Sequence, residues 1–219
     1  MQVKLIFSLQ YIKMKKVFDR FREVATLFEE SSLNEDTSVS YRRYKDVTFS
    51  DNIKFYSFDN VEFINCTFES NLINVVFHNV KFERCEMSNI TLEKCGIQKC
   101  LFDSCHMVGI NFIDSNIKNT DFLNSNMMMN NMDKTNLTKD VFVNVKFTSA
   151  TITEVLFDDD TFTDVDFSST EFYGTSLAGV DFTNSNITEI MVAPDMVRGV
   201  IVNNVQAIDF INLLGIIIK

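Results

Sequence analysis

The sequence of 219 residues contains no tryptophan, one proline, six glycines and two histidines. Six glycines are too few for most glycine-rich loops that bind nucleotides, and His78 and His106 belong to no Ser–His–Asp or metal-ligand pattern. No apolar run approaches the roughly 18–20 residues that a membrane-spanning helix needs. We therefore expect no catalytic residue, no metal site, no cofactor and no membrane association.

Large apolar side chains are abundant, with 22 phenylalanines and a hydrophobic share of 46%. From Phe77 onward every fifth residue is large and apolar, without exception up to Val192. Upstream, one residue is missing between Ile73 and Phe77, and the same step of five connects Ile53, Phe58, Phe63, Phe68 and Ile73. Neither the helix period of 3.6 nor the strand period of 2 produces this pattern. Each unit is therefore predicted to be a short extended segment plus a bend, with one large side chain pointing inward.

The spacing of identical residues indicates how many sides each coil has. Phenylalanine recurs every twenty residues, at Phe82, Phe102, Phe122, Phe142, Phe162 and Phe182. A step of fifteen, which a three-sided coil would require, connects mixed residue types instead. The sequence therefore predicts an all-β solenoid with four sides and about seven coils, spaced by ~4.8 Å.

The residue two positions before each large one is mostly small or β-branched, which suits a second inward position near a bend. All five cysteines occupy this position: Cys66, Cys85, Cys95, Cys100 and Cys105. Regular cysteine spacing can indicate a metal site or disulfides, but we expect these side chains to fill the core, with Cys85 and Cys105 stacked. Free thiols in a core fit a reducing compartment, which favours a cytoplasmic location.

Several five-residue units share one pattern: a small residue, then Asn or Asp, then a large apolar residue and two polar ones. Examples are residues 115–119, 120–124, 180–184 and 185–189. This pattern, over about residues 50–193, resembles the pentapeptide-repeat family. The resemblance implies a right-handed quadrilateral β-helix, and it does not fix a function.

Both ends of the chain depart from the repeat. Residues 1–48 are expected to form an N-terminal cap, with an amphipathic helix at 14–30 marked by Phe18, Phe21, Val24, Ala25 and Phe28, and a polar loop at 31–48. The β-helix is expected over residues 49–193, leaving residues 194–219 for a C-terminal helix and tail.

The C-terminal helix is expected to start at Asn203 or Asn204 and to end at Gly215. An apolar stripe and tail follow from the spacing: Val205, Ile208, Ile211, Leu214, Ile216 and Ile218. We predict that these residues form the interface of a two-fold homodimer, because such a tail would be exposed in a monomer. The alternative is that the helix caps the last coil within one chain.

Charge is distributed unevenly along the chain. Residues 1–22 carry six basic side chains against one acidic, so the net charge of −10 becomes −15 over residues 23–219. Such a rod repels nucleic acid and attracts a basic partner. The densest acidic run is Asp158–Asp160, with Glu154 and Asp164 beside it. This run has three possible interpretations: a face that is simply solvated, a site that binds a cation, or a surface that mimics phosphates.

Apolar residues also occupy positions that should face solvent: Val108, Ile113, Leu123, Met128, Met129 and Val143. Leu123 and Val143 are one coil apart on one face, as are Val108 and Met128 on the next. A clustered exposed apolar patch is a candidate partner surface. Local packing outside the coil, or cover by the N-terminal segment, would also account for these residues.

The tail resembles that of the bacterial quinolone-resistance pentapeptide proteins. The shared features are the Arg-Gly-Val at 198–200, the Gln-Ala at 206–207 and the Leu-Leu-Gly-Ile at 213–216. The resemblance implies rods that dimerise end to end, resemble B-form DNA in width and charge, and bind DNA gyrase or topoisomerase IV. The outward loops of many such proteins are missing, because no insertion interrupts the repeat from Phe77 to Val192.

These observations favour a bacterial, non-enzymatic, protein-binding rod, with a type II topoisomerase as the best single partner and no direct binding of nucleic acid. The alternative is a scaffold or recognition module that binds an unrelated protein through the exposed apolar patch.

Overall fold

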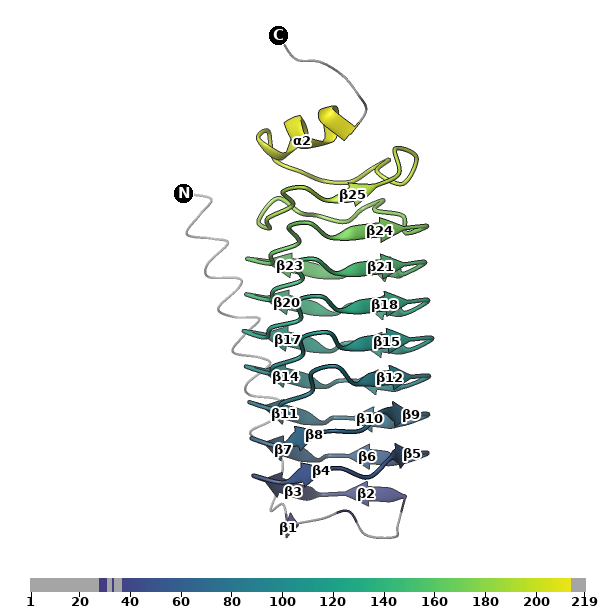
Figure 1. Cartoon of the computed structure of the whole chain (residues 1–219), viewed down its shortest axis with the longest axis vertical. Helices are drawn as coiled ribbons and strands as arrows, with labels where there is room; N and C mark the ends of the chain where they lie inside the picture. The colour runs from purple at the N-terminus through teal and green to yellow at the C-terminus, as the bar shows by residue number, and fades with distance from the viewer. Residues whose placement is uncertain (1–27, 31–32, 34–36, 214–219) are drawn as a thin grey trace.

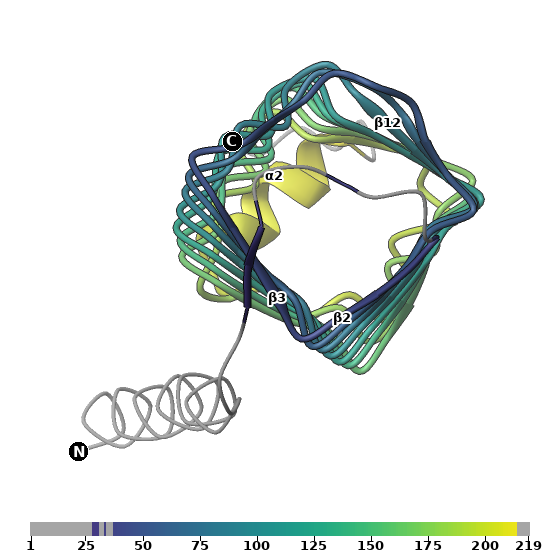
Figure 2. The ribbon, with the colours of Figure 1, turned by 90° about the horizontal axis from the view of Figure 1, so that it is seen from below.

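The computed structural model describes residues 28–30, 33 and 37–213, which form a parallel β-solenoid of about eight turns (Figure 1). Seen along its long axis, the chain follows a four-sided path (Figure 2). Each turn, which we call a coil, contributes one short extended segment to each of four faces. The solenoid predicted from the step of five is therefore confirmed.

Two faces, sheets A and B, carry most of the longer strands. Sheet A contains β1 (Phe28–Glu30), β3 (Arg42–Lys45), β7 (Glu62–Ile64), β11 (Lys81–Glu83), β14 (Leu101–Asp103), β17 (Asp121–Leu123), β20 (Val141–Val143) and β23 (Thr161–Thr163). Sheet B contains β2 (Ser38–Ser40), β6 (Ser57–Asp59), β10 (Val76–His78), β13 (Gly96–Gln98), β16 (Asn116–Lys118), β19 (Asn136–Thr138) and β22 (Leu156–Asp158).

The other two faces complete each coil. Sheet D contains β5 (Ile53–Lys54), β9 (Leu72–Ile73), β12 (Thr91–Glu93), β15 (Asn111–Ile113), β18 (Asn131–Asp133), β21 (Thr151–Thr153), β24 (Glu171–Tyr173) and β25 (Met191–Val192). Sheet C contains β4 (Thr48–Phe49) and β8 (Thr67–Phe68). It continues as isolated bridges that join Thr67, Glu86, His106, Asn126, Lys146, Asp166 and Asn186.

The core is a set of stacked columns, one for each face. On sheet A the Phe82 and Phe102 rings stack with centroids 4.5 Å apart and an interplanar angle of 4°. The same stack continues through Phe122, Phe142 and Phe162. The prediction of four sides from a period of twenty is confirmed by this column. Burial of each ring in a stack removes a large apolar area from water, which is the main stabilising contribution.

Bends between faces use the left-handed backbone conformation. The second residue after an inward side chain has a positive φ at almost every bend, as at Asn79 (φ 53°) and Asn119 (φ 51°). Asn and Asp tolerate this conformation better than most residues because their short polar side chains bond to the local backbone. This explains their frequency in the repeat.

The solenoid starts earlier than residue 49, and it has about eight coils where the sequence predicted about seven. Residues 38–40 and 42–45 are β2 and β3, so the predicted loop at 31–48 is wrong for them. Val39 and Tyr44 are buried, and the Tyr44 ring stacks on Phe63 with centroids 5.3 Å apart. These two residues continue the step of five backwards from Phe49, where the sequence prediction had stopped.

The register slip lies one unit earlier than predicted. Leu72 is the inward residue that pairs with Leu92, while Ile73 pairs with Glu93 on the outside. The chain therefore takes a step of four from Phe68 to Leu72, and also from Phe49 to Ile53. Among the described residues, these two bends have no residue with positive φ, so each is one residue shorter than the others.

The ends of the chain give two different outcomes for the predicted helices. Residues 28–30 form β1, which pairs with β3, so the predicted helix at 14–30 does not extend to its last three residues. The rest of that prediction lies outside the described residues. At the other end, Gln206–Leu213 form helix α2. Its predicted end at Gly215 is also outside the described residues.

Candidate functional site

The four predicted acidic candidates form a belt around the rod instead of one patch. Glu154 follows β21 on sheet D, Asp158 and Asp159 lie at the end of β22 on sheet B, and Asp164 follows β23 on sheet A. All four side chains are exposed. Glu154, Asp159 and Asp164 have φ angles of 49°, 62° and 53°, so each stands at a bend. The belt, defined by these four residues, presents negative charge at three of the four edges of one coil.

Two further aspartates, Asp140 and Asp160, lie at the edge of the rod that follows sheet B, next to Asp159. Asp140 is fully buried, and its carboxyl oxygens accept hydrogen bonds from the backbone N–H groups of Thr120 (2.8 Å) and Thr138 (3.0 Å). Asp160 repeats this arrangement one coil later, accepting from the N–H groups of Asp140 (2.8 Å) and Asp158 (3.0 Å). Burial raises the pKa of the Asp140 carboxyl to about 8 and that of Asp160 to about 6. These side chains act as structural acceptors for the coil.

The predicted apolar patch does not exist as one surface, because its members lie on three faces. Leu123 and Val143 pair on sheet A, and Ile113 lies on sheet D. Val108, Met128 and Met129 lie on the face that continues sheet C. The expectation that Leu123 is exposed is wrong: its side chain is 1% exposed and packs with Leu101 and Val143.

Of the six residues in the predicted patch, Met129 is the one whose side chain is exposed. Met129 is 61% exposed, while Val108 and Met128 are half-buried. Met129 also has a positive φ of 55°, which is uncommon for a bulky residue. This Met patch, defined by Val108, Met128 and Met129, is therefore small and flexible in its side chains.

All five cysteines lie in the core, as predicted. Each is buried and unpaired in a disulfide, and each thiol donates to a backbone carbonyl, as Cys95 does to Leu72 at 3.4 Å. Burial raises the pKa of the Cys95 thiol to about 11. A thiol that keeps its proton is a poor metal ligand and a poor nucleophile. The described residues contain no group of three or more His, Cys, Asp or Glu side chains placed to hold a metal ion.

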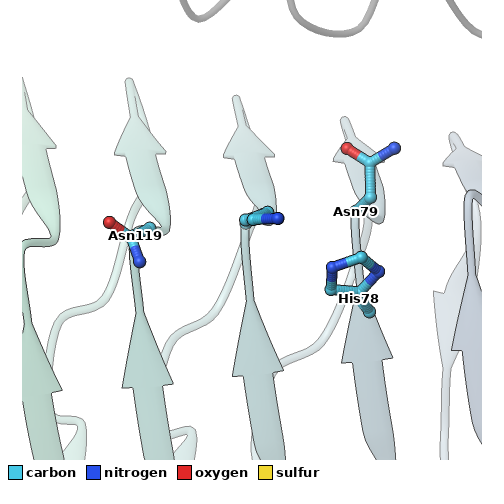
Figure 3. A pocket seen from close by; sticks show the side chains of 4 residues that line it. His78, Asn79 and Asn119 are labelled. Atoms are coloured by element: carbon cyan, nitrogen blue, oxygen red, sulfur yellow. The ribbon is translucent and has the colours of Figure 1, made fainter.

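A hollow of about 430 Å³ lies along one edge of the rod, beside sheet B. Figure 3 shows His78 and Asn79 on one coil and Asn119 two coils away, and Lys99 lines the hollow between them. His78 Nδ1 lies 2.6 Å from Asp59 Oδ1. These four described residues carry no hydroxyl or thiol nucleophile, so the hollow offers amide donors and acceptors, an imidazole and one ammonium group.

Helix α2 closes the C-terminal end of the coil. Asn203 Oδ1 accepts from the N–H of Gln206 (3.0 Å), and Gln206 Oε1 accepts from the N–H of Asn203 (2.8 Å), which is a reciprocal capping arrangement. The Gln206 amide also donates to the carbonyls of Phe182 and Ser185. Phe210 is buried against the core. The helix thus caps the last coil within its own chain.

The exposed members of the predicted dimer stripe are Val205, in the turn before α2, and Ile208, on the helix. Val205 is 76% exposed and Ile208 is 48% exposed, while Ile211 is half-buried. Leu214, Ile216 and Ile218 lie outside the described residues. Capping of the coil therefore leaves Val205 and Ile208 accessible for a contact with a second copy.

Several residues that matter at the surface were not found from the sequence. Leu101 is outward-facing and 0% exposed, and Val76 and Leu156 are exposed apolar residues on sheet B. All three stand immediately before an inward residue, whereas the sequence argument considered only the positions after it. Checking both outward positions of each unit would have identified them.

The repeat and its geometry decide the family. Residues 56–128 and 75–142 match a family model for a pentapeptide repeat region, and residues 161–190 match one for pentapeptide repeats in eight copies. Together these matches cover more than half of the chain. The chain belongs to the pentapeptide-repeat family.

Solved structures of other pentapeptide-repeat proteins are similar to this one at low identity. A trypsin-treated form of QnrB1, a plasmid-mediated fluoroquinolone resistance protein, is 16% identical, covers 83% of this chain and 98% of its own, and has a TM-score of 0.38. HetL, involved in heterocyst differentiation regulation in the cyanobacterium Nostoc sp. strain PCC 7120, is 9% identical, covers 80% and 90%, and has a TM-score of 0.39. At these values neither structure assigns a function to this pentapeptide-repeat protein.

A comparison with curated proteins finds no match to the sequence. Within residues 28–30, 33 and 37–213, no helix of this pentapeptide-repeat protein has the length and apolar character needed to span a bilayer.

Proposed function

We propose that this protein is a non-catalytic, cytoplasmic rod that binds a bacterial type II topoisomerase, DNA gyrase or topoisomerase IV, as a mimic of DNA. The acidic belt of Glu154, Asp158, Asp159 and Asp164 carries this proposal. It surrounds one coil on three edges, in a rod whose residues 23–219 have a net charge of −15.

The physical argument is electrostatic complementarity. Duplex DNA presents phosphates around its axis at about one charge per 1.7 Å, and enzymes that hold it line their grooves with basic side chains. Carboxylates on several edges of a straight rod present negative charge around an axis in the same way. Such a field speeds encounter with a basic groove and repels free nucleic acid.

The C-terminal helix supports the same proposal. The exposed Val205 side chain lies in the turn before α2, and the exposed Ile208 side chain lies on α2. Helix α2 stands at the end of the coil (Figure 1), where contact with a second copy would join two rods end to end. Joining two copies would lengthen the acidic surface without any new site.

Inhibition of supercoiling tests the proposal. The full chain, added to purified gyrase and relaxed plasmid, should inhibit supercoiling at low micromolar concentration, and the inhibition should weaken as salt rises because ions screen exposed charges. Neutralising the belt (Glu154→Gln, Asp158→Asn, Asp159→Asn and Asp164→Asn) should abolish most of it. An absence of inhibition by the wild-type rod, at a large excess over gyrase and over topoisomerase IV, would contradict the proposal.

A second candidate function is favoured by the Met patch. Exposed methionines adapt to partners of different shape, so this patch suits a scaffold that recognises another protein. Binding of that kind should be insensitive to salt and lost in Met129→Asp. Ser149→Asp is the matched control, because Ser149 stands at the same bend one coil along, with a φ of 58°. Equal binding by both variants would remove this candidate.

A further inference from the structure

The outer surface of sheet B carries no acidic side chain over four consecutive strands, β10, β13, β16 and β19. Each strand is followed by a bend residue with positive φ, and these residues are also free of acids: Asn79, Lys99, Asn119 and Lys139. This surface has three lysines, all exposed, at Lys99, Lys118 and Lys139. We call these three residues the lysine strip. It lies on a rod whose residues 23–219 have a net charge of −15.

The coil brings the three lysines close together. The N–H of Lys99 donates to the carbonyl of Lys118 on the next coil, at 3.0 Å. Lys118 pairs in turn with Thr138, which stands directly before Lys139. Lys99 and Lys139 are therefore two coils apart, or about 10 Å at 4.8 Å per strand. Asn119 is the bend residue between them.

The opposite edge of sheet B balances its charges, and this edge does not. The bends between sheets D and B alternate in sign along the rod, as Lys94, Asp114, Lys134 and Glu154. Along the edge between sheets B and A, Lys99 instead has Asn79 and Asn119 as its neighbours. Within the described part of the chain, no carboxylate lies within ion-pair distance of the lysine strip. Repulsion between its ammonium groups is therefore not offset by the coil.

The hollow beside sheet B continues the lysine strip. Lys99 lines it together with His78, Asn79 and Asn119 (Figure 3). The acid at this end, Asp59, is already engaged, because its Oδ1 lies 2.6 Å from His78 Nδ1. The Asn119 amide has no hydrogen-bond partner among the described residues. Such an amide both donates to and accepts from a peptide backbone.

We propose that the lysine strip and this hollow bind an extended acidic segment of a partner protein. Alternate side chains of an extended segment point the same way and are about 7 Å apart. Lysine is a point charge on a long flexible stem, so carboxylates at this spacing fit Lys99 and Lys139 without an exact geometry. The asparagine amides would bond to the backbone of the segment, between the charged contacts.

The same surface suits nucleic acid less well. Backbone N–H groups at bends can cradle a phosphate, but here the N–H groups of Lys99 and Asn119 donate to the carbonyls of Lys118 and Thr138. The outward positions of β10, β13, β16 and β19 hold no arginine and no aromatic residue on which a base could stack. The acidic rod also repels a densely charged polyanion more than a segment with a few acids.

The acidic belt limits the proposed site at one end. Asp158 pairs on the strand after Thr138, and Asp159 is the bend residue after Lys139. These two carboxylates would repel an acidic segment, so the segment lies over the coils from His78 to Lys139. An acidic ligand and a basic groove therefore select different parts of the rod. The proposal does not rest on binding of a topoisomerase.

Fluorescence anisotropy of a labelled synthetic peptide of alternating Glu and Thr tests the proposal. The full chain is titrated into the peptide at low salt, and we expect saturable binding. The triple variant Lys99→Gln, Lys118→Gln and Lys139→Gln should bind about ten-fold more weakly, because exposed ion pairs each contribute modestly. The matched control is Lys54→Gln, Lys134→Gln and Lys146→Gln. It has the same net charge, changes exposed lysines elsewhere on the rod and should bind almost as the wild type does.

Further controls separate this site from the belt. Circular dichroism shows that each variant keeps the coil, and a peptide with Gln in place of Glu should not bind. The belt-neutralised variant should bind the acidic peptide at least as tightly as the wild type, because Asp158 and Asp159 no longer repel it. The proposal would be overturned by equal loss in the two lysine variants, or by an absence of binding to the wild type. Tighter binding of single-stranded DNA of the same charge would overturn it too, in favour of a nucleic-acid site.

Discussion

The rings of Phe122 and Phe142 stack with their centroids 4.8 Å apart and an interplanar angle of 1°. Phe102 stacks on the other side of Phe122, so removal of the Phe122 ring leaves a gap between two rings. We expect Phe122→Ala to lower the free energy of unfolding by about 3–5 kcal/mol. Leu156→Ala, at an exposed position, should change it by less than about 0.5 kcal/mol. Urea unfolding followed by circular dichroism measures both, and equal effects would show that the column does not hold the coil.

The sequence was sufficient to predict this column because one residue type repeats at the length of a coil. It was not sufficient to place the two shortened bends, because Leu72 and Ile73 are both apolar and only the pairing of Leu72 with Leu92 distinguishes them. Leu101 was missed for a different reason: the sequence argument considered only the position after each inward residue, and Leu101 stands directly before one.

Asn130 is a polar residue in an apolar column. It is 1% exposed, and neither its Oδ1 nor its Nδ2 atom has a hydrogen-bond partner within the part of the chain that the structure describes. The equivalent position one coil earlier is Ile110, which is fully buried. Asn130→Ile should therefore raise the free energy of unfolding by about 1–3 kcal/mol, because it removes two buried unpaired polar atoms and fills the site.

Asn130→Ala is the companion variant, since it removes the polar atoms and leaves a space. It should stabilise the coil less than Asn130→Ile does, as measured by thermal unfolding. A loss of stability in the isoleucine variant would show that the amide has a partner that stabilises it.

The buried Asp140 carboxyl makes stability depend on pH. Burial raises its pKa from 3.8 to about 8, so between these values the folded state holds a proton that the unfolded state has lost. Its stabilising contribution is complete below about pH 4 and is lost as pH rises through about 8, at up to ~1.4 kcal/mol per pH unit. Thermal unfolding of the wild type should therefore occur at lower temperature as pH rises from about 5 to about 9.

Asp140→Thr should show a shallower decline. Threonine suits this column, because Thr120 Oγ1 accepts from the N–H of Cys100 one coil earlier. Asp158→Asn removes one charge at an exposed position nearby and should keep the wild-type slope. Identical slopes for Asp140→Thr and wild type would contradict a role for Asp140.

The two sides of α2 should have separable roles. Ile208→Glu alters the exposed side of the helix and should convert a dimer to a monomer, with little change in unfolding temperature. Light scattering measures the mass of the variant. Gln206→Ala removes the amide that donates to Phe182 and Ser185 and should lower stability instead, by about 1–3 kcal/mol. A chain ending at Asp195 should also be monomeric. If Ile208→Glu remains dimeric, the interface lies elsewhere.

The claim that the rod imitates DNA is tested most directly by competition for a topoisomerase. Purified gyrase is incubated with fluorescently labelled duplex DNA, or topoisomerase IV is used if gyrase does not bind the DNA. Unlabelled rod is then added, and the anisotropy of the DNA is measured at several salt concentrations. The account predicts that the rod displaces the DNA, less so at higher salt. It also predicts that the belt-neutralised variant needs at least a ten-fold higher concentration to displace the same amount of DNA.

A control variant with four neutralised acids elsewhere, at Asp46, Asp51, Glu69 and Asp114, has the same net charge and should lose much less affinity. The predicted result is that the wild-type rod and the control variant displace the DNA, and that the belt variant does not. Binding of the rod and DNA to the enzyme at the same time, or equal loss in the two variants, would contradict it.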